Sequence, residues 1–167
     1  MKHLKILIAL GLCLLMPLSS FAATTKGKSA SGRGASGQIL TVTPARAVVD
    51  GQTLTVVGKK YNRDVGIYVA FCEMPKPNTK PEHCYGGINI KGSSKGSIWI
   101  TSHKPWFVPS SAVKKFTNQG SFHVKVTVAR MIDETDCKIT KCAVVTRADH
   151  TDSENRSADV IVPITFK

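Results

Sequence analysis

Four cysteines are the residues whose type and spacing could do chemistry: Cys72 and Cys84 flank a proline-containing stretch, while Cys137 and Cys142 have four residues between them. Thiols at such intervals could bind zinc or form disulfides. Zinc fits poorly, because the C-x4-C spacing has no matching partner pair and the histidines are not set at ligand intervals. Sequence alone permits three disulfide pairings, and we favour Cys72–Cys84 and Cys137–Cys142 because each closes a short loop at a strand end. We expect neither a metal nor another cofactor.

The other polar side chains show no catalytic constellation. No serine or cysteine lies in a nucleophile setting such as G-x-S-x-G, and the histidines are scattered. The oxygen-rich segment 149–154, DHTDSE, could hold calcium. It lacks the glycine at position 6 and the bidentate glutamate at position 12 that an EF-hand loop requires. A turn with local Asx hydrogen bonds is the favoured interpretation there. We therefore expect a protein that is not an enzyme.

The N-terminal residues are typical of a secretory signal peptide. Lys2 and Lys5 precede an apolar run, and small residues follow at a cleavage site that we place after Ala22. Residues 1–22 would then be removed, together with Cys13. The four remaining cysteines suit an oxidising compartment, so we expect a secreted, periplasmic or cell-surface protein.

The mature chain would be strongly basic. Removing Lys2 and Lys5 from the 23 Lys and Arg leaves 21 against 11 Asp and Glu, a net charge of +10. Such a surface favours contact with polyanions, including nucleic acid, envelope polymers and anionic lipid. Residues 23–38 are rich in Gly and Ser, and we expect a flexible basic leader there.

The rest of the chain, residues 39–167, reads as one all-β domain. Hydrophobic residues recur with a period of two in short segments separated by Gly, Asp and Pro, which favours an antiparallel β-sandwich. The segments are 39–43, 52–57, 66–72, 121–130, 143–147 and 158–166, with two weaker candidates at 88–91 and 97–101. Pro163 predicts that the last strand lies at a sheet edge or contains a bulge.

Aromatic residues gather in the sequence near Cys84. Four of them, Tyr85, Trp99, Trp106 and Phe107, could line a cleft for an apolar ligand. We favour the other interpretation, in which they close one end of the sandwich.

A resemblance to a known family rests on three segments and on the order of the four cysteines. The segments are TVTPARAVVDGQTLTVVGKKYN, GIYVAFC and DCKITKCAVVTRADHTDSENRSADVIVPITF. They resemble the neocarzinostatin family, the apoproteins of enediyne chromoproteins. The resemblance covers residues 39–166. It implies an immunoglobulin-like sandwich of seven strands, the two local disulfides, and a ligand cleft beside a small hairpin, in a protein that carries a small molecule.

The chain departs from the antibiotic-carrying members at the cleft. Their aromatic residue two positions after the first bridge cysteine is Met74 here, and their glutamine after the last cysteine is Ala143. Only eight residues separate Val128 from Cys137, which is short for the long hairpin that walls their cleft. These departures argue against an enediyne, and the chain is more similar to a secreted branch found beside haem-uptake modules at cell surfaces.

Our sequence-based prediction is a monomeric, exported, non-enzymatic protein that carries or sequesters an apolar small ligand near the first disulfide. The candidate cleft residues are Met74, Tyr85, Trp99, Trp106 and Ala143. The alternative is a basic surface module that binds polyanions, including DNA without sequence specificity, and has no small ligand. A transmembrane segment in the mature chain is not expected.

Overall fold

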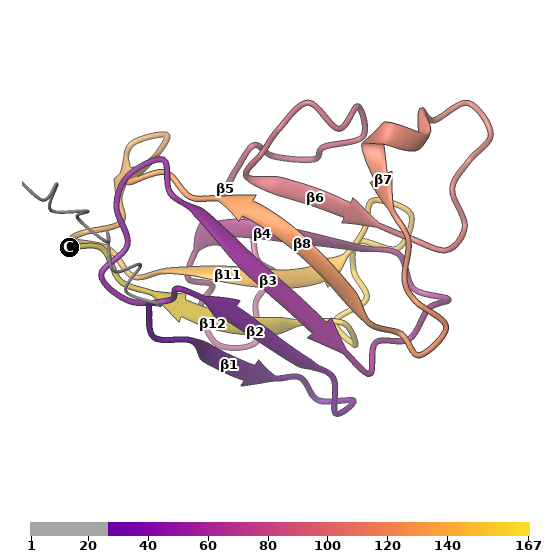
Figure 1. Ribbon diagram of the computed structural model, residues 1–167, viewed down its shortest axis with the longest axis horizontal. Helices are drawn as coiled ribbons and strands as arrows, with labels where there is room; N and C mark the ends of the chain where they lie inside the picture. Colours follow the sequence, from indigo (N-terminus) through magenta and orange to yellow (C-terminus); the bar gives the residue numbers. More distant parts are fainter. Residues whose placement is uncertain (1–26) are drawn as a thin grey trace, which may run out of the picture.

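The structure is a computed structural model that describes residues 27–167 (Figure 1). The predicted signal peptide and the first four residues of the predicted leader lie outside this range. Two β-sheets face each other, and a short hairpin stands beside them. Within the described range, no helix is long and apolar enough to cross a membrane.

The first sheet has four antiparallel strands in the order β1-β2-β3-β8. Its strands are β1 Ala30–Arg33, β2 Ile39–Thr43, β3 Thr53–Lys59 and β8 Phe122–Thr127. Alternate residues of β2, β3 and β8 are buried, as expected for strands with one face on a core and one face toward solvent.

The second sheet has the order β12-β11-β4-β6-β7, with β5 paired to β4. Its strands are β4 Ile67–Glu73, β5 Cys84–Tyr85, β6 Ser97–Ile100, β7 Val113–Lys114, β11 Cys142–Ala148 and β12 Val160–Ile164. A single 3-10 turn, η1 Ser110–Ala112, precedes β7 among the described residues. β12 lies at the sheet edge, as Pro163 predicted, because proline has no N–H to donate to a further strand.

The main core lies between the two sheets. Ile67, Val69 and Phe71 of β4 face it, and Val124 and Val126 of β8 meet them from the first sheet. The opposite face of β4 is buried as well, because loops cover it, and two smaller apolar clusters form there. β4 is therefore the central strand around which both the core and the second layer are built.

The sequence predicted six principal strands correctly, and the predicted all-β sandwich is confirmed. Of the two weaker candidates, 97–101 forms a strand and 88–91 is a turn region. The predicted flexible leader is wrong for Ala30–Arg33, which forms β1 against β2. A Cβ on Gly32 would stand 2.5 Å from the carbonyl oxygen of Ile161, so a glycine there lets β1 pass close over β12.

Both predicted disulfides are present: Cys72–Cys84 joins β4 to β5, and Cys137–Cys142 ends at the first residue of β11. Cys72 and Cys84 are direct cross-strand partners. The first bridge therefore ties the loop 74–83 to the central strand of the second sheet.

A short hairpin of β9 Met131–Ile132 and β10 Thr135–Asp136 occupies the segment between β8 and Cys137. Asp136 fixes its base: Arg130 Nε donates to Oδ1 at 2.9 Å, and the backbone N–H of Lys138 donates to the same oxygen at 2.9 Å. The Arg130 bonds, followed by that of Lys138, hold the pKa of Asp136 at about 2, below its ordinary value of 3.8.

Asp136 should make the stability of the protein depend on pH on the acid side. Because its pKa is lowered by folding, its contribution is fully present above about pH 4 and is lost as the pH falls through about 2. We expect Asp136→Asn to lower the free energy of unfolding at pH 7, and the deficit relative to the parent to shrink toward zero at pH 2. Urea unfolding followed by circular dichroism measures both values.

Asp133→Asn is the matched control, since Asp133 lies in the same hairpin and forms no ion pair with the described residues. It should leave the unfolding free energy close to that of the parent at either pH. A deficit of equal size at pH 7 and pH 2 for Asp136→Asn would show that the charge of Asp136 is not what stabilises the hairpin.

Candidate functional site

A groove lies on the face of the second sheet that points away from the main core. The strand registers set its floor: Ala70 of β4 is the cross-strand partner of Ser97 on β6, and both side chains are small. One pleat further along β4, Tyr68 is paired with Arg147 of β11. The other end is closed by Cys84, disulfide-bonded to Cys72. Because the side chains of Ala70 and Ser97 are much smaller than those of Tyr68 and Arg147 beside them, a hollow remains above Ala70 and Ser97.

The hollow has a volume of about 250 Å³ and lies beneath loops 82–84 and 87–88. It is lined by Tyr68, Ala70, Glu82, His83, Cys84, Gly87, Ile88, Ser97 and Arg147. A second hollow of about 340 Å³ shares Tyr68, Glu82, Ile88 and Arg147 with it and continues to His150 and Ser153. The two form one groove, called the Arg147 groove below.

Two buried polar atoms of the Arg147 groove have no hydrogen-bond partner among the described residues: the Ser97 hydroxyl and Arg147 Nε. Ser97 is fully buried. Arg147 is held in place, since its Nη1 donates to the carbonyl oxygen of Pro81 at 2.6 Å. Buried polar groups without partners are rare in folded proteins, because each costs the free energy of its lost hydration.

The wall opposite the disulfide is a fixed hydrogen-bonded cluster. The hydroxyl of Tyr68 lies 2.8 Å from Nδ1 of His150. Burial and then the negative charge of Asp149 raise the pKa of the Tyr68 phenol, so the hydroxyl keeps its proton.

Trp99 packs against both Tyr68 and His150, and it is hydrogen-bonded to Asp149. Trp99 is 1% exposed, and its Nε1 donates to Oδ2 of Asp149 at 2.8 Å. The other carboxylate oxygen of Asp149 accepts from the backbone and the hydroxyl of Thr151, at 2.9 and 2.5 Å. The predicted Asx turn is therefore present at Asp149, but this residue is buried instead of solvated, because it satisfies the indole of a core tryptophan.

The five candidate cleft residues are spread over the molecule, and none is among the lining residues of the Arg147 groove. Trp99 lies in the apolar cluster beneath it, and Ala143 is fully buried behind the first disulfide. Tyr85 packs its ring on Gly96, where a Cβ would come within 2.2 Å of the ring. Trp106 is 92% exposed on a separate turn. Met74 lines other hollows.

One of those hollows, of about 430 Å³, lies against the Cys137–Cys142 bridge and is largely apolar. Met74, Ile139 and Phe166 contribute to it. No buried polar atom without a partner belongs to its lining residues. The Arg147 groove is therefore the better candidate for specific recognition, since directional hydrogen bonds fix which ligand fits.

Sequence reasoning missed Ser97, Arg147 and Ile88. Each of them is ordinary in the sequence, and only the pairing of β6 and β11 with β4 brings Ser97 and Arg147 to one face. The alternation along β4 did place Tyr68 and Ala70 on a common face. It carried no information about which strands would lie beside them.

Comparison with solved structures gives one informative similarity. Macromomycin matches the chain with a TM-score of 0.52 and a probability of 1.00, over 78% of this chain and 100% of the macromomycin chain, at 18% sequence identity. The chain has a neocarzinostatin-like fold. At this identity the similarity establishes the fold alone. The chain matches no protein-family model and no curated protein.

The neocarzinostatin-like fold confirms the resemblance seen in the sequence at the level of architecture. It is a disulfide-containing β-sandwich, and local disulfides of this kind are typical of proteins outside the reducing cytosol.

Proposed function

We propose that this protein is an exported, non-enzymatic binding protein that holds a small, mainly apolar ligand in the Arg147 groove. The observation that carries the proposal is the hollow itself, which is lined by Ser97 and Arg147, two residues with a buried donor that has no partner among the described residues. The neocarzinostatin-like fold that the chain shares with macromomycin supports the proposal, because the resemblance in the sequence implies a protein that carries a small molecule. Export rests on the predicted signal peptide and the two disulfides.

The lining suggests what the ligand looks like. Ala70, Ile88 and the disulfide of Cys84 present apolar surface to the body of a ligand. Ser97 and Arg147, each with a buried donor that lacks a partner, both line the same hollow. An amphipathic molecule with an anionic acceptor group, such as a carboxylate or sulfonate on an apolar frame, satisfies both features, because charge-assisted hydrogen bonds to arginine are the strong ones.

A pair of fluorescent probes tests this assignment. The anion 8-anilinonaphthalene-1-sulfonate and the uncharged N-phenyl-1-naphthylamine have similar aromatic frames. We expect Arg147→Met to weaken binding of the sulfonate by about 10- to 100-fold, the effect of a lost hydrogen bond to a charged group. Binding of the uncharged probe should change less than about twofold. Fluorescence titration at fixed ionic strength gives both affinities.

Two further variants control this test. Arg63→Met removes a positive charge elsewhere and should leave both affinities unchanged, since Arg63 does not line the Arg147 groove. Ala70→Leu fills the floor of the groove and should weaken both probes. Near-ultraviolet circular dichroism checks that each variant is folded. If the sulfonate bound the parent and the Ala70→Leu variant equally well, the groove would not be the binding site.

A further inference from the structure

A tightly held turn between β6 and η1 presents two aromatic side chains to solvent. The backbone N–H of Val108 donates to the carbonyl oxygen of Pro105 at 3.1 Å, which places Trp106 and Phe107 at the centre of the turn. The ammonium of Lys104 closes it from inside, donating to Pro105 O at 3.0 Å and to Val108 O at 2.6 Å. Val108 itself is buried in the cluster with Trp99. The turn is therefore anchored to the fold.

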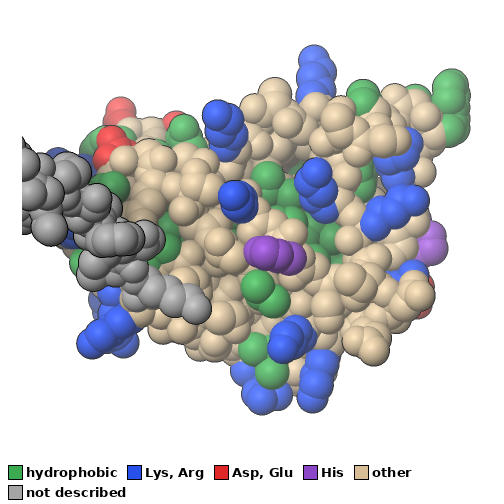
Figure 2. Space-filling view, in the orientation of Figure 1, with side chains coloured by type: hydrophobic (Ala, Val, Ile, Leu, Met, Phe, Trp, Pro, Cys, Tyr) green, Lys and Arg blue, Asp and Glu red, His purple; other side chains and the backbone are tan. Residues whose placement is uncertain are grey.

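The exposure of this aromatic pair is unusual. Trp106 is 92% exposed and Phe107 is 67% exposed. Large aromatic side chains dominate cores and interfaces, and contiguous exposed apolar surface marks binding sites. Figure 2 shows hydrophobic side chains projecting at one corner of the molecule. Ile90, in the loop before β6, is 39% exposed, and Gly92 of that loop lies directly against Ala112 of η1.

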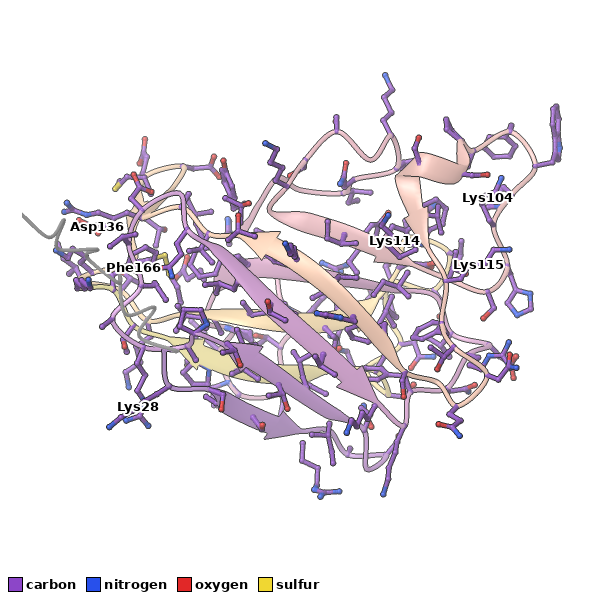
Figure 3. All side chains as sticks on the ribbon, in the orientation of Figure 1. Lys28, Lys104, Lys114, Lys115, Asp136 and Phe166 are labelled. Carbon is purple, nitrogen blue, oxygen red and sulfur yellow. A yellow bond between two sulfur atoms is a disulfide. The ribbon has the colours of Figure 1, made fainter. Side chains whose placement is uncertain are left out.

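The stretch of chain that contains this turn is rich in positive charge. Residues 83–132 contain seven Lys and Arg and no Asp or Glu. Figure 3 shows Lys104, Lys114 and Lys115 grouped at the end of the molecule opposite Asp136 and Phe166. The six lysines of the stretch form no ion pair with the described residues. Except for Lys104, whose ammonium is bound to carbonyl oxygens of the turn, their charges are thus available to an anionic partner.

We propose that the turn 104–109 docks on the surface of an anionic lipid bilayer, with Trp106 and Phe107 inserted among the headgroups and the surrounding lysines facing the lipid phosphates. Tryptophan favours the membrane interface, and lysine near such a surface is attracted by anionic lipid. Nucleic acid fits less well. The two rings meet at 90° with centroids 5.9 Å apart, so they form a wedge and not a flat platform on which successive bases stack.

Vesicle binding by the folded, disulfide-bonded protein tests the proposal. We expect co-sedimentation with vesicles of phosphatidylcholine and phosphatidylglycerol, and little with phosphatidylcholine alone. The double variant Trp106→Ala/Phe107→Ala should weaken binding about tenfold or more at an unchanged melting temperature. Lys114→Gln/Lys115→Gln should weaken it by a similar factor and reduce its dependence on salt.

The chain contains only two tryptophans, and this allows a direct readout of insertion. Trp99 is buried, so brominated lipid should quench the emission of Trp106, and the quenching should disappear in Trp106→Phe. Ile139→Ala is the matched control, because Ile139 is 86% exposed and lies in the loop closed by the Cys137–Cys142 disulfide, away from the turn 104–109. Vesicle binding that survives loss of both aromatic side chains would overturn the proposal. Failure to bind vesicles, with Trp106-dependent binding to single-stranded DNA, would replace it with nucleic-acid binding.

Discussion

Replacing Trp99 with alanine is expected to lower the free energy of unfolding by about 3–5 kcal/mol, the range for a large aromatic removed from a core. Trp99 is 1% exposed, packs on Tyr68 and His150, and is hydrogen-bonded to Asp149. Its loss opens a cavity and leaves a buried carboxylate oxygen without its donor. Urea unfolding followed by far-ultraviolet circular dichroism measures the change without relying on tryptophan emission.

Two further variants separate the effect of the Trp99 hydrogen bond from that of its volume and burial. Trp99→Phe keeps much of the apolar volume but removes the indole N–H, so it should cost less than the alanine variant, about 1.5–3 kcal/mol for the bond to the carboxylate. Trp106→Ala should stay within about 0.5 kcal/mol of the parent, because the side chain is exposed. Equal losses at the two tryptophans would contradict the burial that the structure assigns to them.

Removing the Cys72–Cys84 bridge by a double serine substitution should cost about 3 kcal/mol if chain entropy is the main term. The bridge closes a separation of 12 residues and joins β4 to β5 directly. Cys72 is also fully buried, so serine places a hydroxyl in an apolar cluster and adds to the loss. The groove beside Cys84 should lose its probe affinity in the same variant. Thermal unfolding and the sulfonate titration measure the two effects.

The Cys137–Cys142 bridge is the internal control, since it spans a separation of only 5 residues. Removing it should cost about 2 kcal/mol in the same entropic account. Binding to the Arg147 groove should persist there, because neither cysteine lines it. A larger loss from this bridge than from Cys72–Cys84 would show that loop closure does not set the order of their contributions.

The cysteines and strands were accessible to sequence reasoning because their signals are local. The alternation in segments such as 121–130 records which residues share a face, and short separations between cysteines favour local closure. β1 was missed because Ala, Ser and Gly carry no hydrophobic pattern. It forms through backbone hydrogen bonds to the edge of β2 that faces away from β3. Such backbone pairing does not depend on the type of the side chains.

The sequence by itself determined an all-β sandwich with two short-range disulfides, a strongly basic surface and the absence of a recognisable catalytic motif. The tertiary structure decided which tryptophan is buried and which is presented to solvent, and it assembled Ser97 and Arg147 beside Ala70. The physical reason is that periodicity along a strand fixes the direction of side chains but not the identity of neighbouring strands. Sites built across strands, such as the Arg147 groove, depend on that pairing.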